Sequence, residues 1–347
     1  MPIDIQKLFF LGRPLGPIYG FAMQVRQVLY RHSILPRKRL AVPVISVGNL
    51  VLGGTGKTPV VKHLAQLLQN NGYSPAIISR GYRGTAKHSV NIVSNGEKLL
   101  LSPLEGGDEP TMLAQSLPNI PVLTGKRRAI PALYAVEQYN THSIVLDDGF
   151  QHLGIERDID IVLFDATTLA GNSRIFPGGP LREPVSALKR CHCFLITGIN
   201  EDNRKRAELF TDLLQQRFPE KPVFHLKTNG LSIQGKTVSN NFLDNYEPAF
   251  AFCGIANPQR FLVSLEKQGV NIGGFHALSD HVRYTEKLLS QLCQKAKESG
   301  SRSLITTEKD GVKLVEIDLS LPLFIARLEN SIPPEFDQFI ISTLQKL

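Results

Sequence analysis

The stretch AVPVISVGNLVLGGTGKTP, residues 41–59, constrains the fold more than any other part of the chain. It opens with a mostly apolar run, Ala41 to Val47, which predicts a buried strand. A glycine-rich loop follows and ends in Gly56-Lys57-Thr58. Apolar residues then recur at helical spacing in VVKHLAQLLQNNG, which predicts a helix. A strand, a glycine-rich loop, GK[ST] and a helix together are typical of the phosphate-binding P-loop.

This loop predicts a nucleotide site. Glycines let backbone N–H groups surround phosphate oxygens, and the helix N-terminus adds a partial positive charge. We expect Lys57 to reach the β- and γ-phosphates and the Thr58 hydroxyl to bind Mg²⁺. The usual pattern has a glycine where Val51 stands, so the alternative is a chance glycine-rich turn before a helix. The strand and helix on either side favour the P-loop, and its predicted nucleotide-binding residues are Gly53, Gly54, Thr55, Gly56, Lys57 and Thr58.

Two carboxylates end another apolar strand, SIVLDD, which covers residues 143–148. A carboxylate at the end of a core strand is the Walker B arrangement, which lies close to the P-loop magnesium. Asp147, Asp148 and Thr58 are therefore the predicted metal ligands. A second apolar strand, IDIVLFD, ends at Asp165 and is the alternative. The doubled acid and the polar tail Gly149-Phe150-Gln151-His152 favour the first strand.

Other strand and helix ends carry charges suited to a phosphate. The strand SPAIIS runs into Arg80-Gly81-Tyr82-Arg83-Gly84, at the edge where open α/β sheets bind ligands, although a solvated turn is the alternative. Lys126-Arg127-Arg128 starts a predicted helix, where three bases oppose the helix dipole, so an anionic partner is expected. Arg182, in the Pro- and Gly-rich loop 174–184, is either an anion ligand or part of a surface ion pair.

Two adjacent acids, Asp108 and Glu109, follow Gly106-Gly107 and precede a helix predicted over residues 111–116. Acids at a helix start complement the dipole as caps. A flexible glycine pair just ahead of them also suits an active-site loop. This fragment by itself favours neither interpretation.

The order of predicted elements divides the 347-residue chain into three parts. Strands alternate with helices over residues 41–221, which predicts a parallel sheet covered by helices on both faces, the α/β fold of P-loop NTPases. The pattern changes at Pro222, where PVFHLKTNGLSI predicts a β-ribbon with a hairpin turn at Asn229-Gly230. We therefore expect a P-loop domain at 41–221 and a smaller α/β domain at 222–347, joined by the ribbon.

Cysteine usage indicates a reducing environment. The four cysteines have no disulfide-framework spacing, which predicts free thiols in a cytosolic-facing protein. Cys191-His192-Cys193 invites a metal site, but it opens the apolar run CFLIT and fits no trusted zinc spacing. The start of a strand is the favoured interpretation.

The first 40 residues form the third part and hold most of the net charge. Seven basic residues stand there against Asp4, so the segment carries six of the eight net positive charges. Apolar and aromatic residues are interspersed, with a helix predicted from about Ile18 to His32, yet no run is long enough to span a membrane. A basic, aromatic amphipathic segment suits an anionic membrane surface. The alternatives are a helix packed on the body of the protein and a nucleic-acid arm.

Seven motifs, in this order, resemble the tetraacyldisaccharide 4′-kinases of lipid A biosynthesis. They are GNLVLGGTGKTP, SRGYRG, GGDEP, LDDGFQH, FPGGPLREP, SDHVRY and TTEKD, and the resemblance runs from the N-terminal segment to about residue 313. It implies a P-loop kinase domain at 41–221 and transfer of the ATP γ-phosphate to the 4′-hydroxyl of a tetraacylated glucosamine disaccharide 1-phosphate. The product is the 1,4′-bisphosphate, lipid IVA. It also implies a peripheral protein on the cytoplasmic face of the inner membrane of Gram-negative bacteria.

The resemblance further implies that Asp108 and His281 act together on the substrate hydroxyl. With ATP and Mg²⁺ as cofactors, the expected catalytic residues are Asp108, His281, Lys57 and Arg128. The expected substrate-binding residues are Arg80, Glu109, Gln151, His152 and Arg182. The expected partners are the acylated disaccharide and an anionic membrane surface, with no nucleic acid and no obligate protein partner.

Two other functions are less consistent with the sequence. P-loop switch or partitioning ATPases and GTPases usually carry lysine where Leu52 stands, and the guanine-reading N/T-K-x-D motif is missing because Lys309 comes one place late. A soluble small-molecule kinase or ligase does not account for the basic, apolar N-terminal segment.

Overall fold

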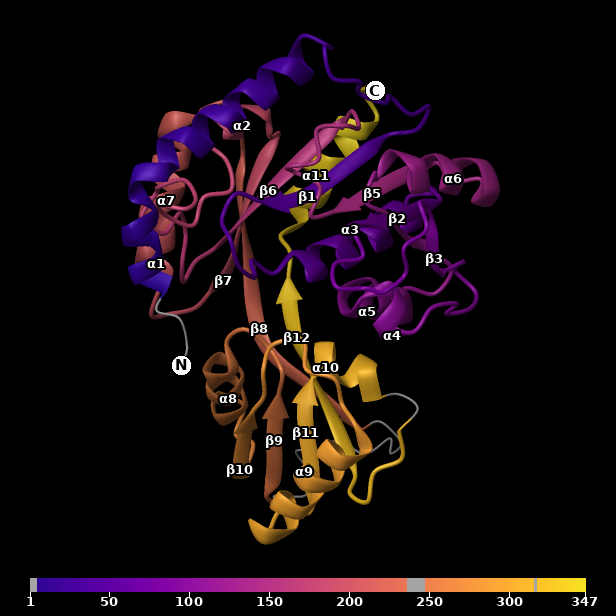
Figure 1. Cartoon of the computed structure of the whole chain (residues 1–347), viewed down its shortest axis with the longest axis vertical. Coiled ribbons are helices and arrows are strands. Elements are labelled where there is room, and N and C mark those ends of the chain that lie inside the picture. The colour runs from indigo at the N-terminus through magenta and orange to yellow at the C-terminus, as the bar shows by residue number, and fades with distance from the viewer. Residues whose placement is uncertain (1–4, 236–246, 315–316) are drawn as a thin grey trace.

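The computed structural model describes residues 5–235, 247–314 and 317–347, which form two lobes (Figure 1). The strands are β1 Val44–Asn49, β2 Pro75–Ser79, β3 Asn91–Ser94, β4 Val122–Thr124, β5 Ser143–Asp147, β6 Ile159–Asp165, β7 Cys193–Ile199, β8 Val223–Gly235, β9 Ala249–Cys253, β10 Ile272–Ala277, β11 Ser303–Thr307 and β12 Leu323–Ser331. The α-helices are α1 Ile5–Gly12, α2 Gly16–Arg31, α3 Lys57–Asn70, α4 Pro103–Gly106, α5 Asp108–Ser116, α6 Ala129–Tyr139, α7 Arg204–Arg217, α8 Pro258–Lys267, α9 Glu286–Glu298, α10 Glu308–Gly311 and α11 Pro334–Leu344. Short 3-10 helices cover Arg13–Leu15 (η1), Val185–Arg190 (η2) and Val312–Leu314 (η4).

A 12-stranded sheet runs through both lobes in the order β10-β9-β11-β12-β8-β7-β6-β1-β5-β2-β4-β3. In the first lobe, β1 runs parallel to β5 on one side and to β6 on the other. The carboxyl ends of these three strands, at Asn49, Asp147 and Asp165, therefore meet at one edge of the sheet, where α/β proteins bind ligands. This is the parallel sheet predicted for residues 41–221.

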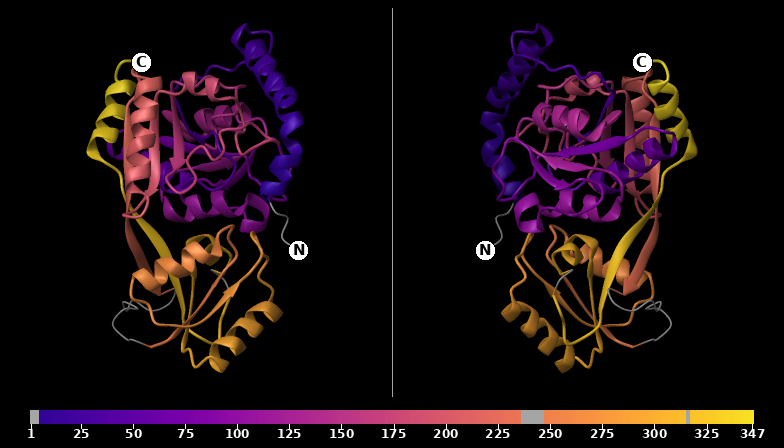
Figure 2. Two further views of the ribbon diagram at one scale, coloured as in Figure 1. Left: turned by 90° about the vertical axis from the view of Figure 1, so that its left-hand side faces the viewer. Right: turned by 90° about the vertical axis from the view of Figure 1, so that its right-hand side faces the viewer.

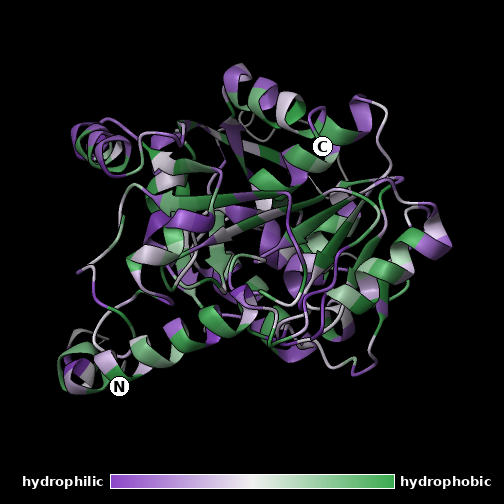
Figure 3. Cartoon of the chain, turned by 90° about the horizontal axis from the view of Figure 1, so that it is seen from above, coloured by the Kyte–Doolittle hydropathy of each residue, from purple (hydrophilic) through white to green (hydrophobic). Residues whose placement is uncertain are grey.

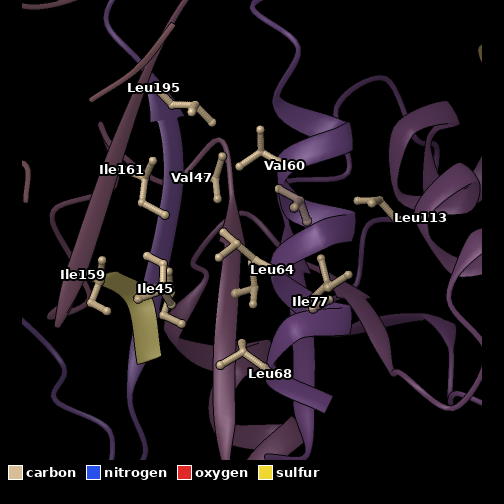
Figure 4. Packing of buried hydrophobic residues seen from close by; sticks show 14 of the residues in the cluster. Ile45, Val47, Val60, Leu64, Leu68, Ile77, Leu113, Ile159, Ile161 and Leu195 are labelled. Atoms are coloured by element: carbon tan, nitrogen blue, oxygen red, sulfur yellow. The ribbon is translucent and has the colours of Figure 1, made fainter. Parts of the chain in front are cut away.

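The main core of the first lobe forms between this sheet and α3 (Figure 4). Val60, Leu64 and Leu68 lie on one face of α3 and are fully buried, as the helical spacing predicts. Each such side chain stabilises the fold by about 1.5–3 kcal/mol through burial. That packing fixes the first turn of α3, which begins at Lys57, directly behind the glycine-rich loop.

The ribbon between the lobes differs from the predicted hairpin. Strand β8 continues straight through Asn229-Gly230, and its partner is β12, which pairs with it antiparallel. Gly230 adopts φ +126° and pairs with Glu329, next to a register shift, so the glycine serves an irregular strand rather than a turn. The Asn-Gly turn signal was misleading because β8 pairs along its length with β7 in one lobe and with β12 in the other.

The last helix returns to the first lobe (Figure 2). Phe336, Ile340 and Leu344 of α11 are buried in the core that contains Leu64 and Leu68 of α3. The prediction that residues 222–347 form one smaller domain therefore does not hold for α11, which packs in the first lobe. Apolar spacing along α11 shows that one face is buried, but it does not indicate which lobe buries it.

The N-terminal helices lie along the outside of the first lobe, with hydrophobic and hydrophilic residues interspersed along them (Figure 3). Helix α2 begins at Gly16 rather than near Ile18, because Pro17 fits the first turn of a helix. Gly12, Gly16 and Gly20 lie against loop 174–184; a Cβ on Gly16 would lie 3.4 Å from the Ile175 carbonyl oxygen. Outside that contact, large apolar side chains are exposed, namely Leu8, Phe10, Leu11, Leu15, Ile18, Phe21, Val25 and Val28.

The packed-helix alternative and the amphipathic prediction thus both describe part of this segment. Helix α2 packs on the body through its glycines and still leaves an apolar surface uncovered. Of the helices in the described ranges, none combines the length and hydropathy that a membrane-spanning helix needs.

Candidate active site

The glycine-rich loop is held in place by side chains at the ends of β1 and β7. Asn49, the last residue of β1, donates from Nδ2 to the Val51 carbonyl at 2.6 Å and accepts from Lys57 Nζ at 3.4 Å. Thr197 of β7 donates its hydroxyl to the Thr55 carbonyl at 3.0 Å. Gly56 adopts left-handed φ +68° immediately before α3, which glycine allows without strain. These contacts hold the backbone of the loop in place.

Val51, the departure from the usual P-loop pattern, has a structural reason. It forms an antiparallel bridge with Leu181 of loop 174–184 and is buried beside it. The Leu52 N–H also donates to the Pro180 carbonyl at 2.8 Å. Because Val51 is paired as an extended strand residue, this position needs no glycine. The Pro- and Gly-rich loop thus braces the P-loop.

The two aspartates of the LDD motif have different environments. Asp147 is buried and accepts a hydrogen bond from Ser79 Oγ at 3.0 Å; burial, with the nearby Glu109, raises its pKa to about 6. Asp148 lies 3.2 Å from Lys57 Nζ and 2.9 Å from Arg182 NH1. Although burial opposes its ionisation, these two cations lower the pKa of Asp148. Asp147 thus lies in a site that favours an added cation, whereas Asp148 already has two.

Asp165, the alternative strand end, has a different partner. Its Oδ2 lies 2.8 Å from NH1 of Arg260, which comes from α8 in the second lobe. A cationic side chain from the other lobe therefore already neutralises Asp165, whereas Asp147 has no such ion pair among the described residues.

The side chains around Asp147 fit a magnesium ion. Mg²⁺ prefers oxygen ligands, and Asp147, Asp148 and Thr58 offer carboxylates and a hydroxyl beside the P-loop. A bound cation would favour the ionised form of Asp147, which burial disfavours. The described residues contain no group of three or more His, Cys, Asp or Glu side chains placed for a metal, so this ion would depend on ligands from nucleotide and water as well.

The Cys-His-Cys motif is the start of a strand, as predicted. Cys193 opens β7, and Cys191 and Cys193 are both buried. Burial raises the pKa of the Cys191 thiol to about 12, which keeps it protonated and unsuited to binding a metal.

Arginines gather around the polar GFQH tail. Arg128 is buried, with NH2 3.3 Å from the Asp148 carbonyl and NH1 3.5 Å from Nδ1 of His152. Burial, then Arg128 and further arginines including Arg80, lower the pKa of His152 to about 4, so its ring is neutral at pH 7. Gln151 accepts from Arg182 at 3.4 Å and donates to the Asn49 carbonyl at 2.9 Å. The structure therefore groups Arg128, His152, Gln151 and Arg182 beside the P-loop carboxylates.

Some of this positive charge has no hydrogen-bonding partner. The Nε–H groups of Arg128 and Arg182 are buried and donate no hydrogen bond within the described part of the protein. Burial lowers the pKa of Arg128, which means that its charge is incompletely compensated. Arg80 is exposed at the end of β2 and adds to the same positive field. This arrangement suits an anion with several oxygens, such as a phosphate.

The GGDEP and SRGYRG loops pack backbone to backbone. Gly107 adopts φ +95°, and a Cβ there would lie 3.0 Å from the Tyr82 carbonyl; a Cβ on Gly84 would overlap the Glu105 carbonyl. Helix α5 starts at Asp108, three residues earlier than predicted, with Asp108 and Glu109 in its first turn. The glycines in both motifs are therefore explained by close approach of the two loops.

Asp108 and His281 meet where the two lobes face each other. Nδ1 of His281 lies 2.9 Å from Oδ2 of Asp108, and both side chains are largely buried. His281 has a left-handed backbone with φ +61°, and its N–H donates to the Gly254 carbonyl at 3.2 Å. Such a conformation is uncommon for a residue other than glycine and often marks a functional position.

Comparison with known proteins identifies the family. A family model described as tetraacyldisaccharide-1-P 4′-kinase matches residues 8–345. This chain belongs to that family. The tetraacyldisaccharide 4′-kinase of Desulfotalea psychrophila is 47% identical over 342 residues, which cover 97% of each chain. That of Syntrophus aciditrophicus is 39% identical and covers 94% of this chain and 91% of the relative. A solved structure of LpxK from Aquifex aeolicus in complex with ATP is 29% identical, with a TM-score of 0.78 over 95% of this chain and 98% of that one.

Membership of the kinase family confirms the resemblance inferred from the seven motifs. The solved relative also confirms the α/β fold class. The two alternative functions, a P-loop switch protein and a soluble small-molecule kinase or ligase, are not supported by these comparisons.

Sequence reasoning missed three charged residues in the second lobe. Arg260 pairs with Asp165, and Lys309 and Lys313 surround the Asp108–His281 pair. The signal for Lys309 was present, since Glu308-Lys309-Asp310 follows β11 at a strand end where ligands bind. Nothing in the sequence around Arg260 or Lys313 indicates a partner in the other lobe.

Proposed function

We propose that this chain transfers the γ-phosphate of ATP to the 4′-hydroxyl of a tetraacyldisaccharide 1-phosphate, giving the 1,4′-bisphosphate. The names of its relatives and the ATP-bound solved relative support this reaction. The observation that carries it here is the Asp108–His281 contact at 2.9 Å, which sets a proton acceptor between the lobes. Asp108 is followed in sequence by Glu109, which acts electrostatically on Asp147 beside the P-loop. The acceptor therefore lies in the same site as the nucleotide.

The nucleotide end of the site works by charge. Backbone N–H groups of residues 53–57 bind the phosphates, and Lys57 neutralises charge as it moves to the β-phosphate oxygens. Lys57 Nζ lies 3.2 Å from Oδ1 of Asp148, and the Lys57 side chain is only 12% exposed. The ion pair therefore holds the ammonium group close to the P-loop. Thr58, Asp147 and Asp148 would hold Mg²⁺, which supplies charge neutralisation for the phosphates when bound. Arg128 and Arg182 add fixed positive charge.

The acceptor end works by proton removal and orientation. A sugar hydroxyl is a weak nucleophile, so a positioned base helps it. Asp108 and His281 act together as this base: the carboxylate orients the imidazole or shares its proton, and the pair accepts the hydroxyl proton. Arg80, Glu109, Gln151, His152 and Arg182 would bind the disaccharide, and the arginines suit its 1-phosphate. Most of the acceleration still comes from positioning and charge neutralisation.

The N-terminal helices suit attachment to the cytoplasmic face of the inner membrane. The substrate acyl chains gain about 0.8 kcal/mol for each CH₂ buried in lipid, so the enzyme must reach them at the bilayer. Phe10, Leu11 and Phe21 are 63%, 74% and 68% exposed on α1 and α2. Arg37, Lys38 and Arg39 follow and are exposed, which suits an anionic surface.

A transfer assay tests this function. The protein is incubated with Mg²⁺, the lipid disaccharide 1-phosphate and ATP labelled on its γ-phosphate, and the lipids are separated by thin-layer chromatography. We expect one new labelled lipid, and none when the acceptor lacks a free 4′-hydroxyl. ATP hydrolysis without a labelled lipid, or labelling of the blocked acceptor, would contradict the proposal.

A further inference from the structure

Helix α2 turns one face toward the active-site loops. Side chains that are buried or partly buried recur along it at helical spacing, at Tyr19, Gly20, Met23, Arg26 and Tyr30. The large apolar side chains of the opposite face are exposed. Of the seven basic residues among the first 40, six are exposed and Arg26 is partly buried. Its place on the inner face indicates a partner within the protein rather than a contribution to a charged surface.

Arg26 binds the main chain of the GFQH tail. Its NH2 donates to the Gln151 carbonyl at 2.9 Å, across 125 positions of sequence. The guanidinium carbon lies 5.8 Å from the centre of the Tyr30 ring, whose π face attracts a cation. Its charge also acts on the neighbouring His152, since burial and then several arginines including Arg26 lower the pKa of that ring to about 4. Arg26 therefore holds the backbone that carries two predicted substrate-binding side chains.

Tyr19 makes a similar contact to the loop 174–184. Its hydroxyl donates to the Arg182 carbonyl at 3.2 Å. The Tyr19 ring packs edge-on against Phe176, with the ring centroids 5.7 Å apart. The glycines of α2 lie against the same loop, so the helix and the loop approach each other closely. Tyr19 therefore holds the backbone at Arg182.

The two residues held in this way contact each other. Arg182 NH1 lies 3.4 Å from Oε1 of Gln151 and 2.9 Å from Oδ2 of Asp148. The Gln151 amide donates to the Asn49 carbonyl at 2.9 Å. The buried Nε–H of Arg182 has no acceptor among the described residues, which leaves a donor for an anionic ligand. Helix α2 thus holds both members of one side-chain pair.

We propose that Arg26 and Tyr19 are positioning residues that hold Gln151 and Arg182, through their main-chain carbonyls, in place for the acceptor headgroup. A small displacement of the groups that orient a substrate lowers the rate strongly, so these backbone contacts affect the use of the acceptor. This inference rests on the proposed function, since it takes Gln151 and Arg182 as ligands of the disaccharide 1-phosphate. It gives the inner face of α2 a role that is distinct from membrane attachment by the exposed apolar face.

The first test uses the acceptor in neutral detergent micelles, where attraction to an anionic surface does not contribute. Tyr19→Phe removes only the hydroxyl and keeps the ring, so we expect kcat/KM for the disaccharide to fall about 3- to 10-fold, the order of one hydrogen bond. Arg26→Met should lower it about 10-fold or more, because charged donors form stronger bonds. The KM for ATP at saturating lipid should change by less than about 2-fold, since other side chains hold the P-loop.

Arg31→Met is the matched control, because it removes the same charge from an exposed position on the same helix. We expect Arg26→Met to lose about 10-fold more kcat/KM for the disaccharide than Arg31→Met does. Arg26→Lys keeps a charged donor and should recover part of the loss. Equal effects of Arg26→Met and Arg31→Met would overturn the inference, and so would a loss of the same size toward ATP.

Double-mutant cycles separate positioning from a general loss of packing. If Tyr19 acts through Arg182, Tyr19→Phe should change kcat/KM for the disaccharide by less than about 2-fold in an Arg182→Ala background. Arg26→Met should likewise have little further effect in a Gln151→Ala background. Additive losses in these cycles would overturn the inference.

The outcomes distinguish this inference from the proposed function. A wild type that labels no lipid would contradict the function itself. A wild type that labels the lipid, with folded Tyr19→Phe at the same kcat/KM for the disaccharide, would overturn only the positioning role. If Arg26→Met does not fold, Tyr19→Phe and its cycle with Arg182→Ala still decide the question.

Discussion

Asp165 and Arg260 form an ion pair across the two lobes, with Oδ2 and NH1 2.8 Å apart. Asp165 ends β6, directly beside the P-loop strand, and Arg260 belongs to α8 of the second lobe. The guanidinium also lies over Gly198, where a Cβ would be 2.6 Å from NH2, so the glycine makes room for it. The strand end that resembles a metal site in sequence therefore serves as a contact between lobes.

This pair predicts which carboxylates serve the metal. Asp147→Ala and Asp148→Ala should lower kcat by at least ~10²-fold, because they remove the proposed ligands of the Mg²⁺ ion that would neutralise charge in the transition state. Asp165→Asn should keep kcat within about 10-fold of wild type, since its partner is an arginine. The measurement is kcat at saturating ATP over a magnesium titration. Loss of activity in Asp165→Asn alone would show that the wrong strand end was assigned.

The nucleotide site predicts large effects from its two polar side chains. Lys57→Ala removes the charge proposed to neutralise phosphate, and Thr58→Ala removes a proposed metal ligand, so each should lower kcat/KM by at least ~10²-fold. Steady-state kinetics in both substrates check this. Lys62→Ala, on the same helix, is the control and should remain near wild type. Near-normal turnover by folded Lys57→Ala would remove the P-loop from the mechanism.

The raised pKa of Asp147 predicts a pH-dependent stability in the absence of metal. Its pKa is about 6 when folded, because of burial and Glu109, and about 3.9 when unfolded. The folded state binds more protons between these values, so stability is lost as pH rises through about 4 to 6. Asp147→Asn avoids this loss and should be more stable than wild type at pH 8, by up to roughly 3 kcal/mol.

Urea unfolding in the presence of a chelator measures this difference. The free energies of unfolding of Asp147→Asn and wild type should converge below about pH 4, where the carboxyl is protonated in both states. Added Mg²⁺ should stabilise the wild type more than the variant. A stability difference that is the same at pH 8 and at pH 4 would show that ionisation of Asp147 is not its cause.

The N-terminal segment predicts electrostatic binding to membranes. Each Lys or Arg near an anionic surface contributes about 1 kcal/mol, so reversing Arg37, Lys38 and Arg39 to Glu should release much of the protein from anionic liposomes. High salt should increase the release. Flotation with such liposomes is the measurement. Reversal of Lys287, Lys295 and Lys297 on α9, the same charge change in the other lobe, is the control. Full flotation of the N-terminal variant would contradict the electrostatic part of this account.

Local patterns predicted the parts of the fold that depend on local chemistry. The P-loop, the carboxylates after β5 and the buried face of α3 all follow from strand and helix periodicity plus turn residues. The bridge between Val51 and Leu181 could not be predicted in this way, because Leu181 lies in another part of the chain. The hairpin predicted at Asn229-Gly230 was wrong for the same reason, since β8 pairs with β12 instead.

Contacts between the lobes were beyond sequence reasoning. Asp108 and His281 lie 173 positions apart, and only the family resemblance placed them together. Arg260 and Lys313 have no sequence signal for a partner in the other lobe, and contact with that lobe gives them specific partners. Periodicity reports that a helix has a buried face, but it does not identify the element that covers that face.

A double-mutant cycle on Asp108 and His281 tests the central claim, that phosphoryl transfer uses a dyad built between the lobes. The measurement is kcat at saturating ATP and lipid for Asp108→Ala, His281→Ala and the double variant, with melting temperatures to confirm folding. Residues that act as one unit are non-additive, so we expect similar losses of about 10²–10⁴-fold in all three. If Asp108 is only a helix cap, its loss should cost about 0.5–2 kcal/mol of stability with kcat nearly intact. Small, independent and additive effects on kcat would contradict the dyad.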